Sequence, residues 1–314
     1  MTILPHEGTG LPDTNAGVVT ANADGTFEIR GVLPGSYDLI ARLPSATGWG
    51  PQNGPDRAQS PWAFGRATVD VVAANVENVA ISVHQGVDLK GRLTVDGKTM
   101  PAAVKVMLQA DDNALAYTGF FQTIGNWAPF IESDGSFLMP MIPEGHYRVR
   151  VGLTNGPTRV PTPNAQGQLP PTPMPVSANA YVADVTQGGR SVYDSGLIVT
   201  AEAPAPLEVV IRTDSGTVSG VVTGMDGKPV PYTAVVLVPD TRRQNPNLYK
   251  TATSDLQGHF SMTRVAPGSY KAFAWMSLAA GAYENADFMS RYESRGIPVR
   301  VTNGASRVDL TVIR

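Results

Sequence analysis

Two Asp-Gly pairs are the first residues in this sequence that could bind a ligand, as oxygen donors to calcium. They are Asp24-Gly25 and Asp134-Gly135. A calcium loop needs several closely spaced oxygen donors. Each pair offers one aspartate, and Asn22 is the one further donor close to Asp24. We therefore interpret both pairs as structural turns, in which glycine accepts a positive φ without steric cost.

The four histidines are the next candidates, as metal ligands. No two of them have the i, i+4 spacing or a similar ligand spacing, so a metal site would need residues from distant parts of the fold. The chain has no cysteine, which excludes disulfides, thiolate metal sites and cysteine nucleophiles. We predict no metal and no cofactor, and we expect His146 and His259 to be exposed strand or turn residues. The other two histidines are His6 and His84.

The serines show no pattern of nucleophilic catalysis. No Gly-x-Ser-x-Gly elbow occurs, and Ser219 lies within a predicted strand. The sequence does not exclude a carboxylate pair for glycoside cleavage. Repeated structural segments are, however, a poor place for one unique pair. We predict that the chain is not an enzyme.

Aromatic side chains in loops are the best indication of a binding function. Exposed tryptophan can stack on sugar rings, which would give a carbohydrate site. The alternative, which we favour, is that these rings cover the ends of a β-sandwich or pack between domains. The candidates are Trp49, Trp62 and Phe64 in a Gly/Pro-rich region, and Trp127 and Phe130 before Asp134.

Composition limits the remaining classes. The chain has 314 residues with a net charge of −3, so it has no strongly basic surface for nucleic acid. It has no run of 18 apolar residues that could span a membrane. Residues 1–20 do not resemble a signal peptide, so the chain is either cytoplasmic or a mature or truncated form. The 32 glycines and 26 prolines indicate many turns and short strands.

Three segments of the chain align without gaps. In each, phenylalanine lies two residues after a glycine, a second glycine lies ten residues after the first, and tyrosine follows two residues later. This pattern predicts a β-hairpin with an internal bend, because apolar residues alternate on both arms. The alternating residues of the first copy are Phe27, Ile29, Val32, Tyr37, Leu39 and Ala41, and the tyrosines of the other copies are Tyr147 and Tyr270.

We predict three modules, with boundaries at 1–84, 85–212 and 213–314. Their linkers are about three to five residues, which should hold neighbours semi-rigidly end to end. The second module contains a Pro-rich surface loop at 155–175. In the third, we expect seven strands near 217–223, 233–239, 249–253, 258–265, 268–276, 297–302 and 306–313. One short helix of about ten residues should begin at the cap Asn285 and pack Phe288, Met289 and Tyr292 onto this module.

The first module lacks a counterpart of the first, glycine-bearing strand and starts at its second strand, Thr2-Ile3-Leu4. A sandwich without that strand exposes unpaired backbone and apolar side chains. This edge could accept a strand from a neighbouring chain, and the protein could then assemble through residues 1–20. The alternative, which we favour, is that the chain is a fragment of a longer protein.

The third module carries the most complete motif set. It has Gly220-Val221-Val222, Gly227-Lys228-Pro229-Val230, Gly258-x-Phe260 and Pro267-Gly268-x-Tyr270. This set resembles the carboxypeptidase regulatory-like domain family, whose relatives include the B-type repeats of collagen adhesins and other transthyretin-like modules. Similar tandem modules occur in large secreted bacterial proteins, notably from acidobacteria. The resemblance implies an all-β fold of seven-stranded, antiparallel, Ig-like sandwiches, an extracytoplasmic location and no catalytic role.

The sequence departs from the family pattern at Gln257, where aspartate usually precedes glycine, which a turn tolerates. Some collagen-adhesin repeats contain a self-made Lys–Asn cross-link between their first and last strands. Lys90 lies on the first strand of the second module, but the last strand at 207–212 has no asparagine. We therefore expect no such cross-link.

These observations together predict a non-enzymatic, extracytoplasmic structural or adhesive protein. Its modules would act as a spacer or assemble into a surface structure or fibre. The alternative is a set of carbohydrate-binding accessory modules of a secreted protein. The partners we expect are a second copy of the chain, other surface proteins or a polysaccharide.

Overall fold

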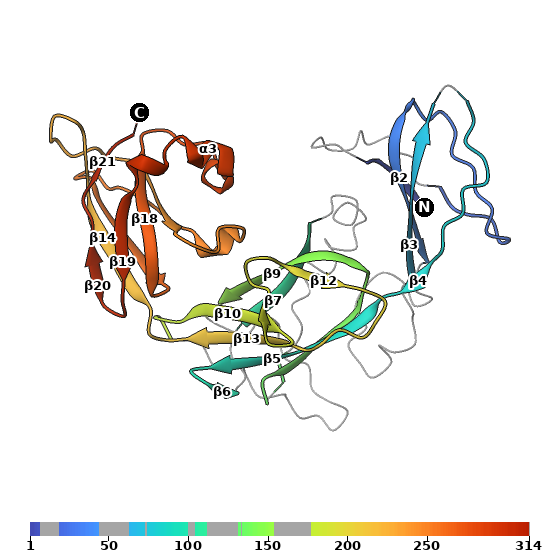
Figure 1. Ribbon diagram of the computed structural model, residues 1–314, viewed down its shortest axis with the longest axis horizontal. Helices are drawn as coiled ribbons and strands as arrows, with labels where there is room; N and C mark the ends of the chain where they lie inside the picture. Colours follow the sequence, from blue (N-terminus) through green and yellow to red (C-terminus); the bar gives the residue numbers. More distant parts are fainter. Residues whose placement is uncertain are drawn as a thin grey trace.

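The structure, a computed structural model, describes residues 1–6, 19–43, 63–72, 74–99, 104–111, 131–132, 134–153 and 177–313. Within this part the regular secondary structure is almost entirely β-strand, with one short α-helix (Figure 1). This confirms the all-β fold class. We keep the names first, second and third module for 1–84, 85–212 and 213–314, and these boundaries stay a prediction. The Pro-rich loop 155–175 lies outside the described residues.

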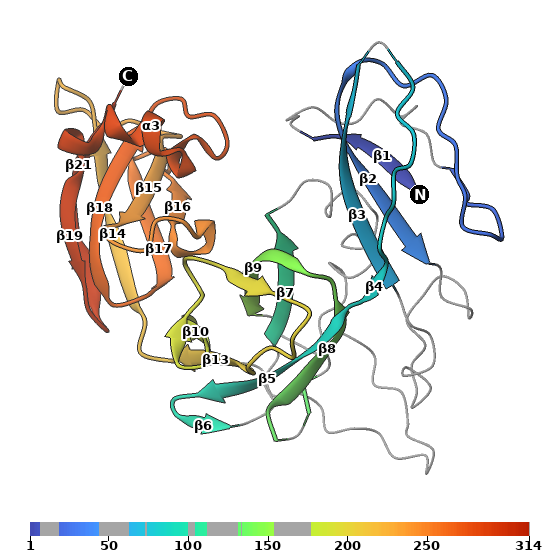
Figure 2. The ribbon, with the colours of Figure 1, turned by 45° about the vertical axis from the view of Figure 1, so that its right-hand side comes forward.

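The third module is a sandwich of two sheets (Figure 2). Its strands follow the predicted spacing closely, except that the last predicted strand, at 306–313, is two short strands at 305–307 and 310–311. One sheet has the order β17-β14-β20, with β21 also paired to β14, and the other has the order β16-β15-β18-β19. The strands are β14 (Gly216–Thr223), β15 (Ala234–Pro239), β16 (Lys250–Thr253), β17 (His259–Val265), β18 (Gly268–Trp275), β19 (Ile297–Val301), β20 (Ala305–Arg307) and β21 (Leu310–Thr311).

The short helix α3 (Ala286–Ser290) is capped as predicted, because the Asn285 side chain accepts a hydrogen bond from the Phe288 amide at 2.9 Å. It has five residues rather than about ten. Its Met289 is buried beside Trp275, which belongs to the core. Single 3₁₀ turns flank it or lie nearby: η2 (Pro246–Leu248), η3 (Ala282–Glu284) and η4 (Glu293–Arg295).

The second module has the same two-sheet plan. Its larger sheet has the order β11-β10-β13-β5-β6, with β8 also paired to β5, and its smaller sheet has the order β12-β9-β7. The strands are β5 (Val87–Val95), β6 (Lys98–Thr99), β7 (Val104–Ala110), β8 (Ser136–Ile142), β9 (Gly145–Leu153), β10 (Tyr181–Gln187), β11 (Arg190–Ser191), β12 (Leu197–Val199) and β13 (Leu207–Arg212).

The first strands of these two modules, β5 and β14, occupy equivalent places. Each pairs antiparallel with the strand that carries the repeated phenylalanine, β8 or β17. Each also pairs parallel with the last strand of its own module, β13 or β20 and β21. The sandwiches are therefore not purely antiparallel, because the first and last strands run in the same direction.

The first module forms one sheet among the described residues, in the order β1-β2-β3-β4. Its strands are β1 (Thr2–Pro5), β2 (Gly35–Leu43), β3 (Ala63–Val71) and β4 (His84–Gln85). The pairing β1-β2-β3 matches β7-β9-β12 and β15-β18-β19 of the other modules. This module therefore shows the second sheet of the sandwich.

The predicted hairpin of the first module forms only in its second arm. β2 is a strand, but residues 26–32, which carry Phe27 and Ile29, are not assigned to one. The equivalent strands β8 and β17 are held by β5 and β14. Residues 26–32 have the same alternating pattern but no such partner in the described chain, so they form no ladder of hydrogen bonds.

The bend of the repeat is nevertheless the same in all three modules. The turn glycine has a positive φ at Gly25, Gly135 and Gly258, and the position six residues later has a positive φ at Gly31, Met141 and Arg264. The repeated tyrosine hydroxyl donates to the backbone carbonyl four residues before it, at 2.8–2.9 Å. These bonds are Tyr37 to Leu33, Tyr147 to Pro143 and Tyr270 to Ala266.

The turn at Gln257 keeps its shape with a different aspartate. In the other two modules Asp24 and Asp134 accept hydrogen bonds from the amide two residues later, at 3.0 and 2.9 Å. In the third module Asp255 takes this role, accepting from the amides of Gln257 at 2.9 Å and His259 at 2.8 Å. The turn therefore tolerates glutamine, as predicted.

Each sandwich packs the repeated phenylalanine against a glycine of its first strand. Gly91 is paired with Phe137, and Gly220 with Phe260. A Cβ atom at Gly91 would lie 2.1 Å from the Phe137 ring, and one at Gly220 would lie 1.7 Å from the Val308 carbonyl oxygen. Any side chain here would force backbone or ring to move, so these positions require glycine. No helix in the described residues is long and apolar enough to cross a membrane.

Replacing the strand glycine tests this packing. We expect Gly220→Ala to lower the free energy of unfolding by about 1–3 kcal/mol, because overpacking displaces Val308 or Phe260. The matched control is Gly304→Ala, where a Cβ would meet nothing nearer than 4.0 Å and φ is not positive. Urea unfolding followed by tryptophan fluorescence measures both. Equal stability of the two variants would contradict the prediction.

Candidate functional site: a polar joint between the second and third modules

The loop at 240–249, between β15 and β16, reaches from the third module to the second. Its central turn, η2, begins at Asn245, whose side chain accepts from the Asn247 amide at 2.9 Å. Proline at the first position of this turn fits, since its missing N–H would be unpaired there. We call residues 240–249, together with the second-module groups that bind them, the joint.

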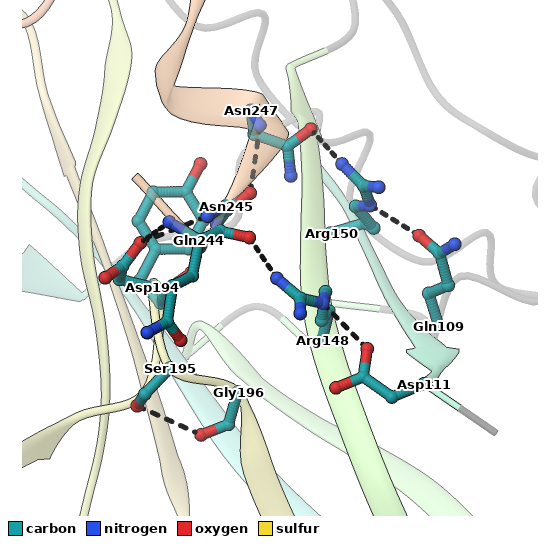
Figure 3. Close-up of polar contacts among 11 residues, drawn as sticks. Gln109, Asp111, Arg148, Arg150, Asp194, Ser195, Gly196, Gln244, Asn245 and Asn247 are labelled. Atoms are coloured by element: carbon teal, nitrogen blue, oxygen red, sulfur yellow. Dashed lines mark hydrogen bonds and ion pairs between the residues drawn. The ribbon is translucent and has the colours of Figure 1, made fainter. Parts of the chain in front are cut away.

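Asp194 and Asn245 tie the two backbones together (Figure 3). Asp194 Oδ1 accepts from the amides of Gln244 at 2.8 Å and Asn245 at 3.0 Å. In return, the Asn245 side-chain amide donates to the Tyr193 carbonyl. Asn245 is 1% exposed, so these bonds replace hydration that its polar atoms have lost.

Two arginines of β9, Arg148 and Arg150, face the loop. Each is first fixed within its own module. Arg148 Nε donates to Asp111 Oδ1 at 2.7 Å, and Arg150 Nε donates to Gln109 Oε1 at 2.7 Å. These bonds within the second module fix the orientation of both guanidinium groups. Less side-chain entropy is therefore lost when the groups bind the third module.

The free ends of these guanidinium groups bind the loop, as Figure 3 shows. Arg148 Nη1 donates to the Gln244 carbonyl, and Arg150 Nη1 donates to Asn247 Oδ1 at 2.9 Å. Next to these polar contacts, the half-buried Leu248 packs against the core of the second module. The joint thus combines an apolar contact with bonds from both modules.

Arg242 makes a second group of contacts at the start of the loop. Its Nη2 donates to Asp184 Oδ1 at 2.6 Å and to Ser191 Oγ at 3.3 Å. Its guanidinium lies 5.8 Å from the centre of the Tyr193 ring. Arg242 has φ of 61°, a conformation that costs a non-glycine residue about 1 kcal/mol or more. The contacts to the second module offset this strain.

The linker itself is also anchored. It consists of three residues between β13 and β14, and Thr213 binds Asp96 through its amide at 3.0 Å and its hydroxyl at 2.5 Å. The Tyr181 hydroxyl donates to Asp214 at 3.1 Å. Burial, with that bond and the charge of Asp214, raises the pKa of Tyr181 to about 12, so the donor proton stays in place at neutral pH.

The loop is held to its own module by a charged cluster around Glu293. Arg243 donates to both Glu293 oxygens at 3.0 and 3.1 Å, and Lys271 Nζ donates at 2.6 Å. Arg243 Nε also donates to the Pro239 carbonyl at 2.7 Å. The hydrogen bonds from Arg243 and Lys271 lower the pKa of Glu293 to about 2. The carboxylate is therefore charged at neutral pH and fixes the base of the loop.

A buried carboxylate in the first module is a second site that the sequence analysis missed. Asp38, 1% exposed, accepts from Arg66 at 2.6 and 3.0 Å, from Thr68 at 2.9 Å and contacts His6 Nδ1 at 3.0 Å. Burial raises the pKa of Asp38, but the bonds from Arg66, His6 and Thr68 outweigh this and lower it. The cluster joins β2, β3 and His6, the residue that follows β1. Its one signal in the sequence is an aspartate within an apolar strand.

The residues that we predicted for sugar binding are placed only in part. Phe64, on β3, is half-buried and packs against Leu4 and Ile40 of the first module and against the core of the second. Trp49, Trp62, Trp127 and Phe130 lie outside the described residues. The carbohydrate site therefore stays a prediction.

The aspartates and the other histidines considered as metal ligands lie in turns and on strands. Asp24 and Asp134 Oδ1 also accept from the hydroxyls of Thr26 at 2.7 Å and Ser136 at 2.6 Å, which closes their turns. Three histidines are exposed on strands: His84 on β4, His146 on β9 and His259 on β17. Among the described residues, no three His, Asp or Glu side chains gather as metal ligands.

Comparisons with known proteins leave the family open. The sequence matches no family model and no curated protein. Among solved structures, similar regions occur in a proposed carbohydrate-binding protein of Pseudomonas aeruginosa (18% identity, 31% of this chain and 88% of that one, TM-score 0.20). They also occur in the minor pilin of Streptococcus agalactiae (13%, 72% and 95%, 0.28) and the major pilin subunit of Bacillus cereus (11%, 72% and 98%, 0.22).

At these scores the likenesses carry no argument about function. The resemblance to carboxypeptidase regulatory-like domains likewise stays a prediction. The all-β fold rests on the strands of the structure itself.

The Glu293 cluster predicts an acid-sensitive third module. Because its folded pKa lies below the ordinary value of 4.5, Glu293 stabilises the fold above that pH, and this contribution is lost as the pH falls toward about 2. Its side chain is 36% exposed, so screening keeps the contribution at about 1 kcal/mol or less. Urea unfolding from pH 7 to pH 2.5 measures it.

Glu293→Gln should be less stable than the wild type at pH 7 and should lose less stability on acidification. The control Glu284→Gln changes an exposed glutamate of η3 and should follow the wild-type profile. If Glu293→Gln and the wild type lose stability in parallel, the cluster does not contribute as described.

Proposed function

We propose that this chain is a non-enzymatic structural or adhesive protein of the cell surface, whose modules act as a stiff spacer. The joint is the observation that carries this proposal. A spacer works only if its modules do not swing about their linkers. Here a linker of three residues is supplemented by a loop that binds the neighbouring module at several separate points.

The chemistry of the joint favours one fixed orientation. Asp194, Asn245 and Arg242 would each lose a hydrogen-bonded partner if the modules rotated apart. Asn245 is the buried member of the three, and an unpaired buried polar group costs about 1–3 kcal/mol. Arrangements that keep Asn245 buried without its bond to Tyr193 are therefore disfavoured. Apolar contacts alone would tolerate sliding, because they have no directional requirement.

An extracytoplasmic location is part of the same proposal. It is supported by the resemblance to a family of extracytoplasmic sandwich modules. The other carboxylates in the described part that form clusters, such as Asp38 and Glu293, are engaged in holding strands and loops together. This use of charge fits a structural role.

A distance measurement across the joint tests the spacer. The chain has no cysteine, so spin labels can be attached at Lys90→Cys on β5 and Thr263→Cys on β17, two exposed positions. We expect a single narrow distance distribution in double electron–electron resonance. Asp194→Ala should broaden it, because the amides of Gln244 and Asn245 then lose their acceptor.

The matched control is Asp70→Ala, which removes an exposed carboxylate of β3 in the first module. It should leave the distribution unchanged. A broad distribution in the unmodified joint would refute the stiff spacer. Antibody labelling of intact cells that produce the protein tests the surface location separately.

A further inference from the structure

A groove of about 1030 Å³ opens on one side of the sheet of the first module. The sheet contributes Ile3, Leu39 and Val69 to its floor, all on the face that forms the core in the other modules. Two segments outside the strands form its walls, at 24–32 and at 72 and 74–79. The apolar members of these walls include Phe27, Ile29, Val32, Val72, Val76 and Val79.

The walls of this groove correspond to the neighbours of the first strand in the complete sandwiches. Residues 26–32 match β8 and β17 through the shared phenylalanine and the shared bend. Residues 79–83 match β13 through their alternating apolar residues. In the second module, β5 lies between β8 and β13 and pairs with both. The groove is therefore the position of a first strand.

Equivalent apolar side chains are less buried in the first module than in the second. Phe137 and Leu207 of the second module are 4% and 0% exposed. Their counterparts in the first module, Phe27 and Val79, are only half-buried. The side chains are of the same kind, so the difference comes from the covering strand. A strand in the groove would remove this apolar surface from water.

The backbone amides and carbonyls of the two walls can also form hydrogen bonds with an added strand. In the described part of the chain, residues 27–32 and 79–83 make no backbone-to-backbone hydrogen bond. The turn carbonyl before the phenylalanine accepts from the first strand in both complete modules, from Leu93 to Gly135 and from Val222 to Gly258, each at 2.8 Å. Gly25 is the counterpart of these glycines. Such unpaired edges are sites for the addition of a strand.

The wall at 24–32 and the first residues of β2 already have the bend found in the complete modules. Gly25 and Gly31 have the positive φ values found at the same positions of the complete modules. The Tyr37 hydroxyl makes the same bond to the carbonyl four residues earlier. A docking strand therefore meets a preformed bend, which lowers the conformational entropy that binding would cost.

The groove also specifies the residue types of its occupant. Phe27 requires a glycine opposite it, because Gly91 and Gly220 leave no space for a Cβ beside the equivalent rings. The residue after this glycine varies, because it is arginine in β5 and valine in β14. Asp24, Glu28 and Glu77 line the groove together with Arg30, which is paired with Glu28 at 2.9 Å.

We propose that the groove binds an extended strand of the β5 type from a partner polypeptide, with glycine facing Phe27. The strand runs antiparallel to 26–30 and parallel to 79–83, as β5 does to β8 and β13. Its alternate apolar residues cover Ile3, Leu39 and Val69. This completes the first sandwich and makes the module a docking site for such a strand.

A synthetic peptide tests this proposal on the full chain. The probe is the nine-residue sequence of β5, Val87–Val95, with blocked ends. We expect saturable binding, and hydrogen–deuterium exchange of the amides at 26–30 and 79–83 to slow about tenfold or more, because they become paired. Exchange within β14 should not change. The same peptide with valine in place of its glycine should bind about tenfold more weakly or worse, because its side chain overlaps the Phe27 ring.

Two protein variants localise the effect. Phe27→Ala should weaken peptide binding, and Leu33→Ala, which alters an exposed side chain of the same bend, should not. The peptide comparison does not depend on how either variant folds. The proposal is overturned if neither peptide slows exchange, or if both do so equally. It is also overturned if 26–30 is already protected without peptide, since the chain or a second copy then fills the groove.

Discussion

Each complete sandwich in this protein depends on one strand that forms backbone hydrogen bonds along both edges. β5 and β14 each join the strand of the repeated phenylalanine to the last strand of their module. Their glycines let the phenylalanine ring lie directly against the backbone. In the second and third modules, where this central strand is present, the segments on both sides of it are strands with buried apolar residues. The described part of the first module contains no such central strand, and the segments 26–32 and 79–83 form no strands.

The joint shows how two such sandwiches acquire a defined relation. The loop at 240–249 is fixed at its base by Arg243 and Glu293 and at its tip by Asn245. The second module presents Arg148 and Arg150 with their positions already set by their own neighbours. Both surfaces are therefore organised before they meet. Directional bonds between them then select one orientation, which a short linker alone would not do.

The fold could be predicted well because its signals are local. A few adjacent residues specify the positive-φ turn at Gly258, the bend that follows it and the hydrogen bond of the Tyr270 hydroxyl. The strands of the third module follow the predicted spacing for the same reason. The joint and the Asp38 cluster had no comparable signal. Arg150 and Asn247 are 97 residues apart in the sequence, and Asp38 and Arg66 are 28 residues apart.

The turns and the alternating faces of the strands follow from the sequence alone, since these depend on neighbours in the chain. Tertiary structure decided whether an alternating segment becomes a strand at all. Phe27 and Phe137 stand in nearly the same local pattern, but within the described residues a glycine-bearing strand lies beside Phe137 and none lies beside Phe27. A strand is stabilised by hydrogen bonds to another segment, and that partner is not encoded in the strand's own residues.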